Sequence, residues 1–227
     1  MKRIGIIAAL PGELRPLVHN WDRRGAVWSG RIGQHEAVAA CAGMGAAAVT
    51  RACERVLADG ALDALVSIGW AGSLSCGLRT ATATAVREVI DAGSGERFPT
   101  AIPDGQRLIT IDRVADAQEK RRLAQEYQAV LVDMEAATVA RLARTKDLDF
   151  YCFKGISDGP SDKLPDFNRF IGADGQLRMA AFLTWAAVHP ATWRPIGRLA
   201  KNSRAAAGEL AQLVITRLGD TVGHPRR

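Results

Sequence analysis

Short apolar runs alternate along this chain with longer segments that carry apolar residues at helical spacing. The runs over 4–10, 65–68 and 150–156 are mostly apolar, which is typical of strands buried on both faces of a largely parallel sheet. Residues 45–59 and 135–146 instead place apolar side chains three or four positions apart, which predicts helices. Strands and helices in this succession predict right-handed crossovers between parallel strands.

The remaining segments continue this alternation, apart from one hairpin and one irregular stretch. Residues 26–32 and 36–42 are predicted to pair as a hairpin across the turn Gly33-Gln34. Between residues 80 and 112 only short apolar pieces surround a turn-rich stretch, and we expect a mobile loop there. Four further elements are predicted: a helix over 116–125, a strand over 129–132, a helix through 177–185 and a last amphipathic helix over 195–218.

The whole pattern predicts one α/β domain over residues 1–227, built in three α/β/α layers around a central twisted mixed sheet. A chain of 227 residues that is 48% hydrophobic is long enough to bury one sizeable core. We find no internal repeat, low-complexity tract or linker that would separate a second domain. A basic helical segment from about residue 190 is expected as an addition to this domain.

Cysteine and histidine usage argues against a disulfide scaffold and a metal centre. The cysteines stand far apart, at Cys41, Cys53, Cys76 and Cys152. They form neither a C-x-x-C pattern nor a compact disulfide framework, so reduced thiols and a cytoplasmic location are expected. The histidines show no metal-ligand spacing, so no metal is expected. The apolar start imitates a signal peptide but breaks at Pro11-Gly12, and it is interpreted as a strand.

The net charge of +6 is concentrated near the C-terminus. Beyond Trp185 only Glu209 and Asp220 oppose the basic residues, which are Arg194, Arg198, Lys201, Arg204, Arg217, Arg226 and Arg227. Such asymmetry can mark a nucleic-acid or membrane surface. No interleaving of aromatic and basic residues accompanies it, so a solvated helix face is favoured and no nucleic-acid partner is expected.

Three carboxylates follow buried strands within a few residues. They are Glu13 in LPGEL, Glu135 in VDMEA and Asp158 in GISDG. Each has an ordinary structural explanation, because Glu13 and Glu135 suit the first turn of a helix and Asp158 suits a turn. In an open α/β sheet, however, ligands bind outside the carboxyl ends of strands. The combination therefore predicts a ligand site at that edge.

Two glycine-rich pieces accompany these carboxylates: CAGMGAAA over 41–48, and IGWAGSL over 68–74, whose small residues are predicted to form a turn after a strand. Together they resemble the methylthioadenosine/S-adenosylhomocysteine nucleosidase branch of the nucleoside phosphorylase and nucleosidase superfamily. The resemblance runs from the N-terminus to about Leu183 and is most specific at 132–136 and 155–158. It implies a phosphorylase/hydrolase-like fold and an enzyme that cleaves the N-glycosidic bond of a purine nucleoside.

The resemblance also implies a role for each carboxylate. Asp158 would be the general acid that protonates N7 of the purine, and Glu13 would orient or deprotonate the water that attacks C1′. Glu135 would accept hydrogen bonds from the ribose hydroxyls, with Met134 packed under the sugar. Because the transition state is expected to be cationic at the sugar, these carboxylates would also stabilise it electrostatically. The other substrate-binding positions implied are Gly43, Met44, Gly45, Trp70, Ala71, Gly72, Phe153, Ser157 and Phe167.

The nucleophile side of the ribose would face Gly43, Met44 and Gly45. Their backbone N–H groups stand at a predicted helix start, where a phosphorylase would hold phosphate. The arginine that binds phosphate in the family is missing, since Ser67 and Ile68 stand at its position. Hydrolysis is therefore favoured, and phosphorolysis, with phosphate as co-substrate, is the alternative. No other cofactor is expected.

Two departures from the family concern the base and the space beside the ribose. Trp70 stands where a small hydroxyl residue is usual. The aromatic side chain that stacks on the base is missing, and Val114 is nearest to its place. Phe153 and Phe167 are candidate replacements, although a core role is favoured for Phe153.

The C-terminal segment adds one alternative substrate. Its apolar positions alternate with bases, as in a helix on a membrane surface: Leu199, Leu210, Leu213, Val214 and Leu218. A lipid-linked nucleoside, such as the adenosylhopane handled by hopanoid-associated members of the superfamily, would fit such a surface. A helix packed on the sheet or on a second subunit is favoured instead.

The resemblance further implies a small-molecule nucleoside as ligand and a homo-oligomer, most simply a dimer. A catalytically silent nucleoside-binding protein on the same fold is a second hypothesis, and the three retained carboxylates argue against it. A dinucleotide-binding protein is disfavoured because the full G-x-G-x-x-G fingerprint is missing.

Overall fold

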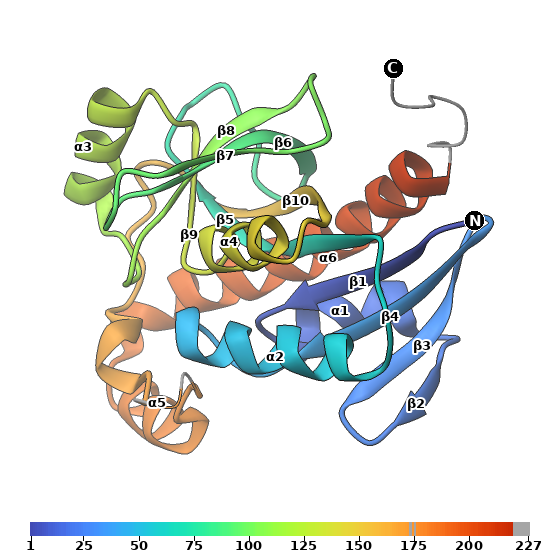
Figure 1. The fold of residues 1–227 in the computed structure, drawn as a ribbon. Helices are drawn as coiled ribbons and strands as arrows, with labels where there is room; N and C mark the ends of the chain where they lie inside the picture. The colour runs from blue at the N-terminus through green and yellow to red at the C-terminus, as the bar shows by residue number, and fades with distance from the viewer. Residues whose placement is uncertain (173, 175, 220–227) are drawn as a thin grey trace.

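The computed structural model describes residues 1–172, 174 and 176–219 (Figure 1). Asp220, Arg226 and Arg227 of the basic tail lie outside the described residues. The strands are β1 (Arg3–Ala8), β2 (Asp22–Arg24), β3 (Val27–Ile32), β4 (His35–Cys41), β5 (Ala64–Ser73), β6 (Ala83–Asp91), β7 (Arg97–Pro99), β8 (Gln106–Thr110), β9 (Leu131–Asp133) and β10 (Asp149–Asp158). The helices are α1 (Pro11–Val18), α2 (Ala46–Ala58), α3 (Ala117–Tyr127), α4 (Ala136–Thr145), α5 (Met179–Ala187) and α6 (Trp193–Gly219), with short 3-10 helices η1 (Phe167–Phe170) and η2 (Pro190–Thr192).

The described strands join one mixed sheet. From one edge their order is β2, β3, β4, β1 and β5, and β5 then pairs with both β9 and β10. Strands β9, β8, β6 and β10 lead back to β5, so this part of the sheet closes into a barrel. Because β1, β5 and β10 run parallel, their C-terminal ends lie at the same edge. The mixed sheet expected from the sequence is confirmed.

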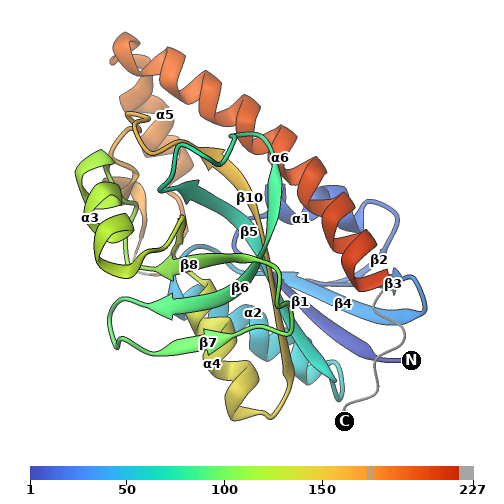
Figure 2. The same cartoon turned by 90° about the horizontal axis from the view of Figure 1, so that it is seen from above.

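Helices cover both faces of the sheet (Figure 2). On one face α2 and α4 pack together and bury Val49 and Val139 in a large apolar cluster. On the other face α1 and α6 contact each other and bury Leu14 and Leu210 in a second cluster. The expected three-layer α/β/α architecture is therefore confirmed.

The structure corrects the predicted elements at three places. The first apolar run does not stay extended to residue 10, since β1 ends at Ala8 and α1 begins at Pro11. Residues 69–72 do not form a turn, because they continue β5 and pair with β10 as far as Gly72. Residues 80–112 are not one loop, because β6, β7 and β8 form there and pair with one another. The first strand, the hairpin and the helices predicted over 45–59, 116–125, 135–146, 177–185 and 195–218 are present within a few residues of their expected bounds.

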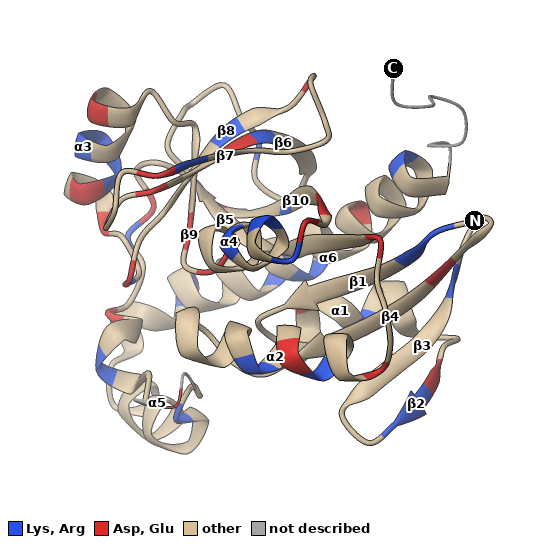
Figure 3. Ribbon diagram, in the orientation of Figure 1, with Lys and Arg blue, Asp and Glu red and all other residues tan. Residues whose placement is uncertain are grey.

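The last helix, α6, packs its apolar side on the sheet. Leu210, Val214 and Leu218 are buried, and α6 contacts β5, β6 and β10. The favoured hypothesis of a packed helix is confirmed, and the membrane-surface alternative is wrong for these positions. Figure 3 shows the basic residues spread along α6, where they are exposed. Across the described residues, no helix has both the length and the hydrophobicity needed to cross a membrane.

Candidate active site

A cavity of about 760 Å³ opens at the edge where β1, β5 and β10 end. This volume lies in the usual range for small-molecule sites. The strand ends, α1 and residues 113–115 and 132–135 line one part of it, while η1, α5 and the first half of α6 line the rest. The position agrees with the rule that ligands bind at the carboxyl ends of strands in α/β sheets.

Most of the site residues expected from the sequence line this cavity. They are Glu13, Met44, Trp70, Ala71, Gly72, Met134, Glu135, Ser157, Asp158 and Phe167. Two of the others stand just behind the lining, where the backbone N–H of Gly43 donates to Ala9 (3.0 Å) and that of Gly45 donates to Glu135 (2.9 Å). The fold therefore gathers segments that are far apart in the sequence around one space.

Phe153 is a correction to the expected site. Its side chain has no exposed surface and belongs to the apolar cluster under α1 and α6. Side chains alternate between the two faces of a strand, and Phe153 lies on the face of β10 that packs on the core. Phe153 does not line the cavity. It is therefore a core residue, as favoured from the sequence, and is not placed to contact a substrate.

Glu13 stands in the first turn of α1 and is only 5% exposed. Its Oε2 accepts hydrogen bonds from the backbone N–H groups of Ala9 (2.9 Å) and Leu10 (2.8 Å), and its Oε1 accepts one from Trp70 (2.8 Å). Burial raises the pKa of Glu13, and these N–H groups and the charge of Lys154 oppose the rise only in part. A carboxylate has about four acceptor sites, so one stays available to a further donor.

Glycine at position 69 permits this close approach between α1 and β5. Its φ of +151° is a conformation that other residues rarely adopt. A Cβ there would lie 2.9 Å from Oε1 of Glu13. Any side chain at this position would push the carboxylate away from the backbone of Trp70.

Asp158 ends β10 and is 5% exposed. Its Oδ1 accepts a hydrogen bond from the hydroxyl of Ser157 (2.5 Å), and its Oδ2 accepts one from the ammonium of Lys120. Lys120 belongs to α3, is 2% exposed and also donates to the carbonyl of Gly159 (2.7 Å). Sequence reasoning missed this lysine, because the run of charged residues over 119–122 gives no sign of which side chain turns inward.

A second buried ion pair joins Asp133 of β9 to Lys154 of β10. Oδ2 and Nζ are 2.8 Å apart, and neither side chain is more than 1% exposed. Asp133 also accepts hydrogen bonds from the hydroxyl of Thr110 (2.6 Å) and the backbone N–H of Ala136 (2.9 Å). Burial disfavours the ammonium of Lys154, but nearby anions, chiefly Asp133, outweigh it and raise its pKa. The sequence motif VDMEA pointed to Glu135 and gave no sign of this pair.

Glu135 precedes α4 and turns toward the start of α2. Its Oε1 accepts a hydrogen bond from the N–H of Gly45 (2.9 Å), and its Oε2 accepts one from the N–H of Met134 (3.2 Å). Burial, followed by the neighbouring carboxylate of Asp133, raises the pKa of Glu135 to about 8.

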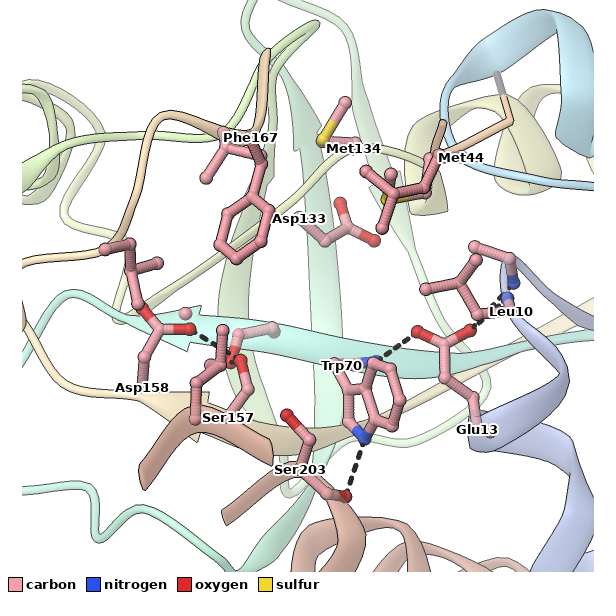
Figure 4. A pocket seen from close by; sticks show the side chains of 18 of the residues that line it. Leu10, Glu13, Met44, Trp70, Asp133, Met134, Ser157, Asp158, Phe167 and Ser203 are labelled. Atoms are coloured by element: carbon pink, nitrogen blue, oxygen red, sulfur yellow. Dashed lines mark hydrogen bonds between the residues drawn. The ribbon is translucent and has the colours of Figure 1, made fainter. Parts of the chain in front are cut away.

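Aromatic and thioether side chains fill the space between the carboxylates. Figure 4 shows Trp70 between Glu13 and Asp158, with Phe167 and Met134 on the opposite side of the cavity. The indole Nε1 of Trp70 donates to a backbone carbonyl of α6, that of Ser203 (2.9 Å). This bond fixes the ring and ties α6 to the site.

The arrangement suits acid and base chemistry on a small ligand. Glu13 reaches the cavity from the first turn of α1 and Asp158 from the end of β10, so a bound ligand can take a proton from one side and lose a proton on the other. Glu135 offers acceptor oxygens between α2 and α4. Within the residues that the structure describes, no three His, Cys, Asp or Glu side chains are grouped so as to hold a metal ion.

Residues 3–108 and 82–187 match, in two overlapping stretches, the family described as the phosphorylase superfamily. The S-adenosylhomocysteine nucleosidase from Streptococcus pyogenes has a similar structure, with a TM-score of 0.73 at 18% identity over 98% of each chain. The futalosine hydrolase of Helicobacter pylori gives a TM-score of 0.70 at 16% identity over 96% of this chain and 97% of its own. No curated protein sequence matches the chain significantly.

The 5′-methylthioadenosine/S-adenosyl homocysteine nucleosidase of Campylobacter jejuni is a further structural relative. Its TM-score is 0.70 at 14% identity, over 96% of this chain and 99% of its own. At these identities the likeness shows a shared fold. The resemblance to nucleoside phosphorylases and nucleosidases expected from the sequence is confirmed.

Proposed function

The chain belongs to the phosphorylase superfamily, a family of enzymes, and from this premise we propose that it cleaves the N-glycosidic bond of a purine nucleoside by hydrolysis. The observation that carries the proposal is a pair of buried carboxylates, Glu13 and Asp158, on two sides of Trp70 in one cavity (Figure 4). Such a pair supplies both a base for water and an acid for the leaving group.

The proposed reaction places the purine near Asp158 and C1′ of the ribose near Glu13. As the C1′–N bond breaks, its electron pair moves to the base, and Asp158 donates a proton to N7 so that the base leaves uncharged. A water molecule attacks C1′ and loses a proton to Glu13. Positive charge develops on the sugar, and the surrounding carboxylates stabilise it.

Glu135 is proposed to bind the ribose hydroxyls, with Met134 and Met44 against the sugar. All three line the cavity. A hydrogen bond from a hydroxyl to a carboxylate favours the ionised form of that carboxylate. Ribose binding therefore opposes the burial that raises the pKa of Glu135.

Two features favour water over phosphate as the nucleophile. The N–H of Gly45, at the start of α2 where an anion would bind, already donates to Glu135. Glu13 and Glu135 both line the same cavity, and a phosphate there would lie beside two acidic groups. Arg15 and Arg204 also line the cavity, so phosphorolysis stays the alternative to be tested.

The backbone of Val114 supports an adenine base. Its N–H donates to Oδ1 of Asn168 (2.8 Å), and its carbonyl accepts from Nδ2 of the same amide (3.2 Å). The edge of adenine offers the same pair, an acceptor at N1 and a donor at N6. Val114 lines the cavity, so we propose that adenine binds there in place of the Asn168 amide.

The wall formed by α5, α6 and the segment before α5 favours an apolar group on the 5′ side of the substrate. Its side chains are Leu177, Met179, Phe182, Ile196 and Leu199. Methylthioadenosine carries such a group, and S-adenosylhomocysteine shares its thioether. A lipid-linked nucleoside is the second candidate, because Met179 is 51% exposed and continues this wall to the surface.

We also propose that the enzyme works in the cytoplasm as a homo-oligomer, most simply a dimer. Large apolar side chains on and next to α5 support an interface, since Leu183, Val188 and Trp193 are each more than half exposed. Exposed apolar patches of this kind mark interaction surfaces. The free cysteines are consistent with a reducing compartment.

The proposed function is tested with purified protein and a panel of adenosine, inosine, methylthioadenosine and S-adenosylhomocysteine, with and without phosphate. We expect free base and free sugar without phosphate, detected by chromatography. Asp158→Asn is expected to lower base release by about 100-fold or more, because the amide cannot donate an acidic proton.

Base release that requires phosphate would identify a phosphorylase instead. Release from a lipid-linked nucleoside alone would select the second candidate. If the unmutated protein binds a nucleoside but releases no free base, the proposal of an enzyme is contradicted, and a nucleoside-binding protein remains.

A further inference from the structure

One of the buried groups that the proposed reaction leaves unused, the ammonium of Lys120, contacts the proposed acid itself. It is 2% exposed and donates to Oδ2 of Asp158 and to the carbonyl of Gly159 (2.7 Å). Taking an ammonium out of water is unfavourable unless good partners compensate. A Cβ on Gly72 would lie 3.1 Å from Oδ2 of Asp158 and 3.2 Å from Nζ of Lys120. The glycine in β5 thus leaves room for this pair.

The pair bears directly on where the proton for the leaving base comes from. A general acid must hold a proton when the bond to the base breaks, whereas an ammonium beside a carboxylate stabilises the ionised carboxylate. Ser157 and Lys120 donate to the two oxygens of Asp158, an arrangement that suits its ionised form. Lys120 carries a proton at hydrogen-bond distance from Oδ2.

Resting on the proposed function, we propose that Lys120 supplies, through Asp158, the proton that the leaving base receives. As the C1′–N bond breaks and its electron pair moves to the base, Lys120 passes a proton to the Asp158 carboxylate and becomes a neutral amine, and Asp158 passes that proton to N7. The attacking water gives its proton to Glu13. After the products leave, Lys120 regains a proton from water and Glu13 releases one, so that nucleoside and water become base and sugar. Lys120 acts through Asp158 and is a positioning residue.

Other charged groups surround the pair without replacing Lys120. Besides the pair itself, the ionisable side chains that line the same cavity or the adjoining loop are Glu13, Arg15, Arg113, Asp133, Glu135, Asp162, Lys163, Arg198 and Arg204. Asp162 is the anion next along the chain, and Arg198 pairs with it (2.8 Å). Arg113 pairs with Asp112 and Glu119 (3.0 Å each). None of these contacts involves the oxygen of Asp158 that accepts from Lys120.

The test compares Lys120→Met and Lys120→Arg on two substrates. One is adenosine, whose base must be protonated, and the other is 4-nitrophenyl riboside, whose leaving group departs as a stable anion. Methionine has no proton to give, and arginine keeps its proton because its pKa exceeds about 12. Each variant is expected to lower kcat/KM for adenosine by about 100-fold or more. The kcat/KM for 4-nitrophenyl riboside should stay near the wild-type value.

The pH profile gives a second readout. In the wild type, the pair delivers a proton for as long as Lys120 is protonated. In Lys120→Met, delivery depends on Asp158 keeping its own proton, so the alkaline limb of kcat/KM for adenosine should move to lower pH. Lys201→Met, which changes an exposed lysine of α6, is the matched control. It should change neither the rate of cleavage of either substrate nor the pH profile of kcat/KM.

Equal losses on both substrates, or a wild-type pH profile in Lys120→Met, would show a purely structural lysine and overturn the proposal. The double variant Lys120→Met/Asp158→Asn removes both charges and should unfold at a temperature near that of the wild type, which separates misfolding from lost proton supply. A wild-type protein that cleaves neither substrate would instead contradict the proposed function itself.

Discussion

The carboxylates at the cavity are held by different kinds of donors, and this separates their chemistry. Backbone N–H groups hold Glu13 and Glu135, whereas side chains hold Asp158. Backbone donors cannot give up their protons at any ordinary pH, but an ammonium can. Of Glu13, Glu135 and Asp158, only Asp158 therefore accepts a hydrogen bond from an ammonium, a group that exchanges protons, which fits an acid better than a base.

At the residue scale, Glu135→Gln is expected to raise stability in alkaline solution. The pKa of Glu135 is raised from an ordinary 4.5 to about 8, so the folded protein keeps a proton that the unfolded chain has lost. The stability that this proton contributes is complete below the pKa of Glu135 in the unfolded chain. It is lost as the pH rises through the pKa of Glu135 in the folded protein. Glutamine stays uncharged, so thermal unfolding should show the variant gaining over the wild type as the pH rises from about 5 to 9.

The control for this prediction is Glu54→Gln, an exposed carboxylate of α2. It should follow the wild type at every pH. If the stability of Glu135→Gln also ran parallel to that of the wild type, burial would not raise the pKa of Glu135.

At the element scale, sequence periodicity predicted most helices and strands because spacing along one segment decides them. It failed where a segment distant in the sequence determines the local structure. Residues 69–72 look like a turn by composition, yet they continue β5 because β10 pairs with them. Lys120 looks like one charge among several on α3, yet the fold turns it toward Asp158. Phe153 could not be placed until the faces of β10 were known.

Gly72→Ala tests the fit between β5 and the Lys120–Asp158 pair. The added methyl would meet Oδ2 of Asp158 at 3.1 Å and Nζ of Lys120 at 3.2 Å, so one of them must move. We expect base release to fall by about 100-fold, since small misplacements of reacting groups cost about that much. Steady-state rates with adenosine measure the effect.

Gly208→Ala is the matched control for that variant, because a Cβ at this position of α6 would meet no atom within 4 Å. It should keep full activity and gain about 0.5–1 kcal/mol of stability, as expected for alanine in a helix interior. An active Gly72→Ala enzyme would show that the pair tolerates displacement and that its geometry does not govern the rate.

At the scale of the whole molecule, the fold brings together residues from both ends of the chain. Parallel strands place Glu13 and Asp158 at one edge, and this much followed from the rule for α/β sheets. The cover formed by η1, α5 and α6 did not follow, because it depends on how the last segment folds back over the sheet. The apolar wall of this cover is the feature that most favours a particular 5′ substituent, the part of the substrate that the sequence motifs do not predict.

The most direct test of hydrolysis runs the reaction in water enriched in oxygen-18 and weighs the sugar product by mass spectrometry. If water attacks C1′ while Asp158 protonates the base, the released sugar carries one heavy oxygen and no phosphate, whether or not phosphate is present. A sugar phosphate, or a sugar without the heavy oxygen after correction for exchange with solvent, would contradict the account.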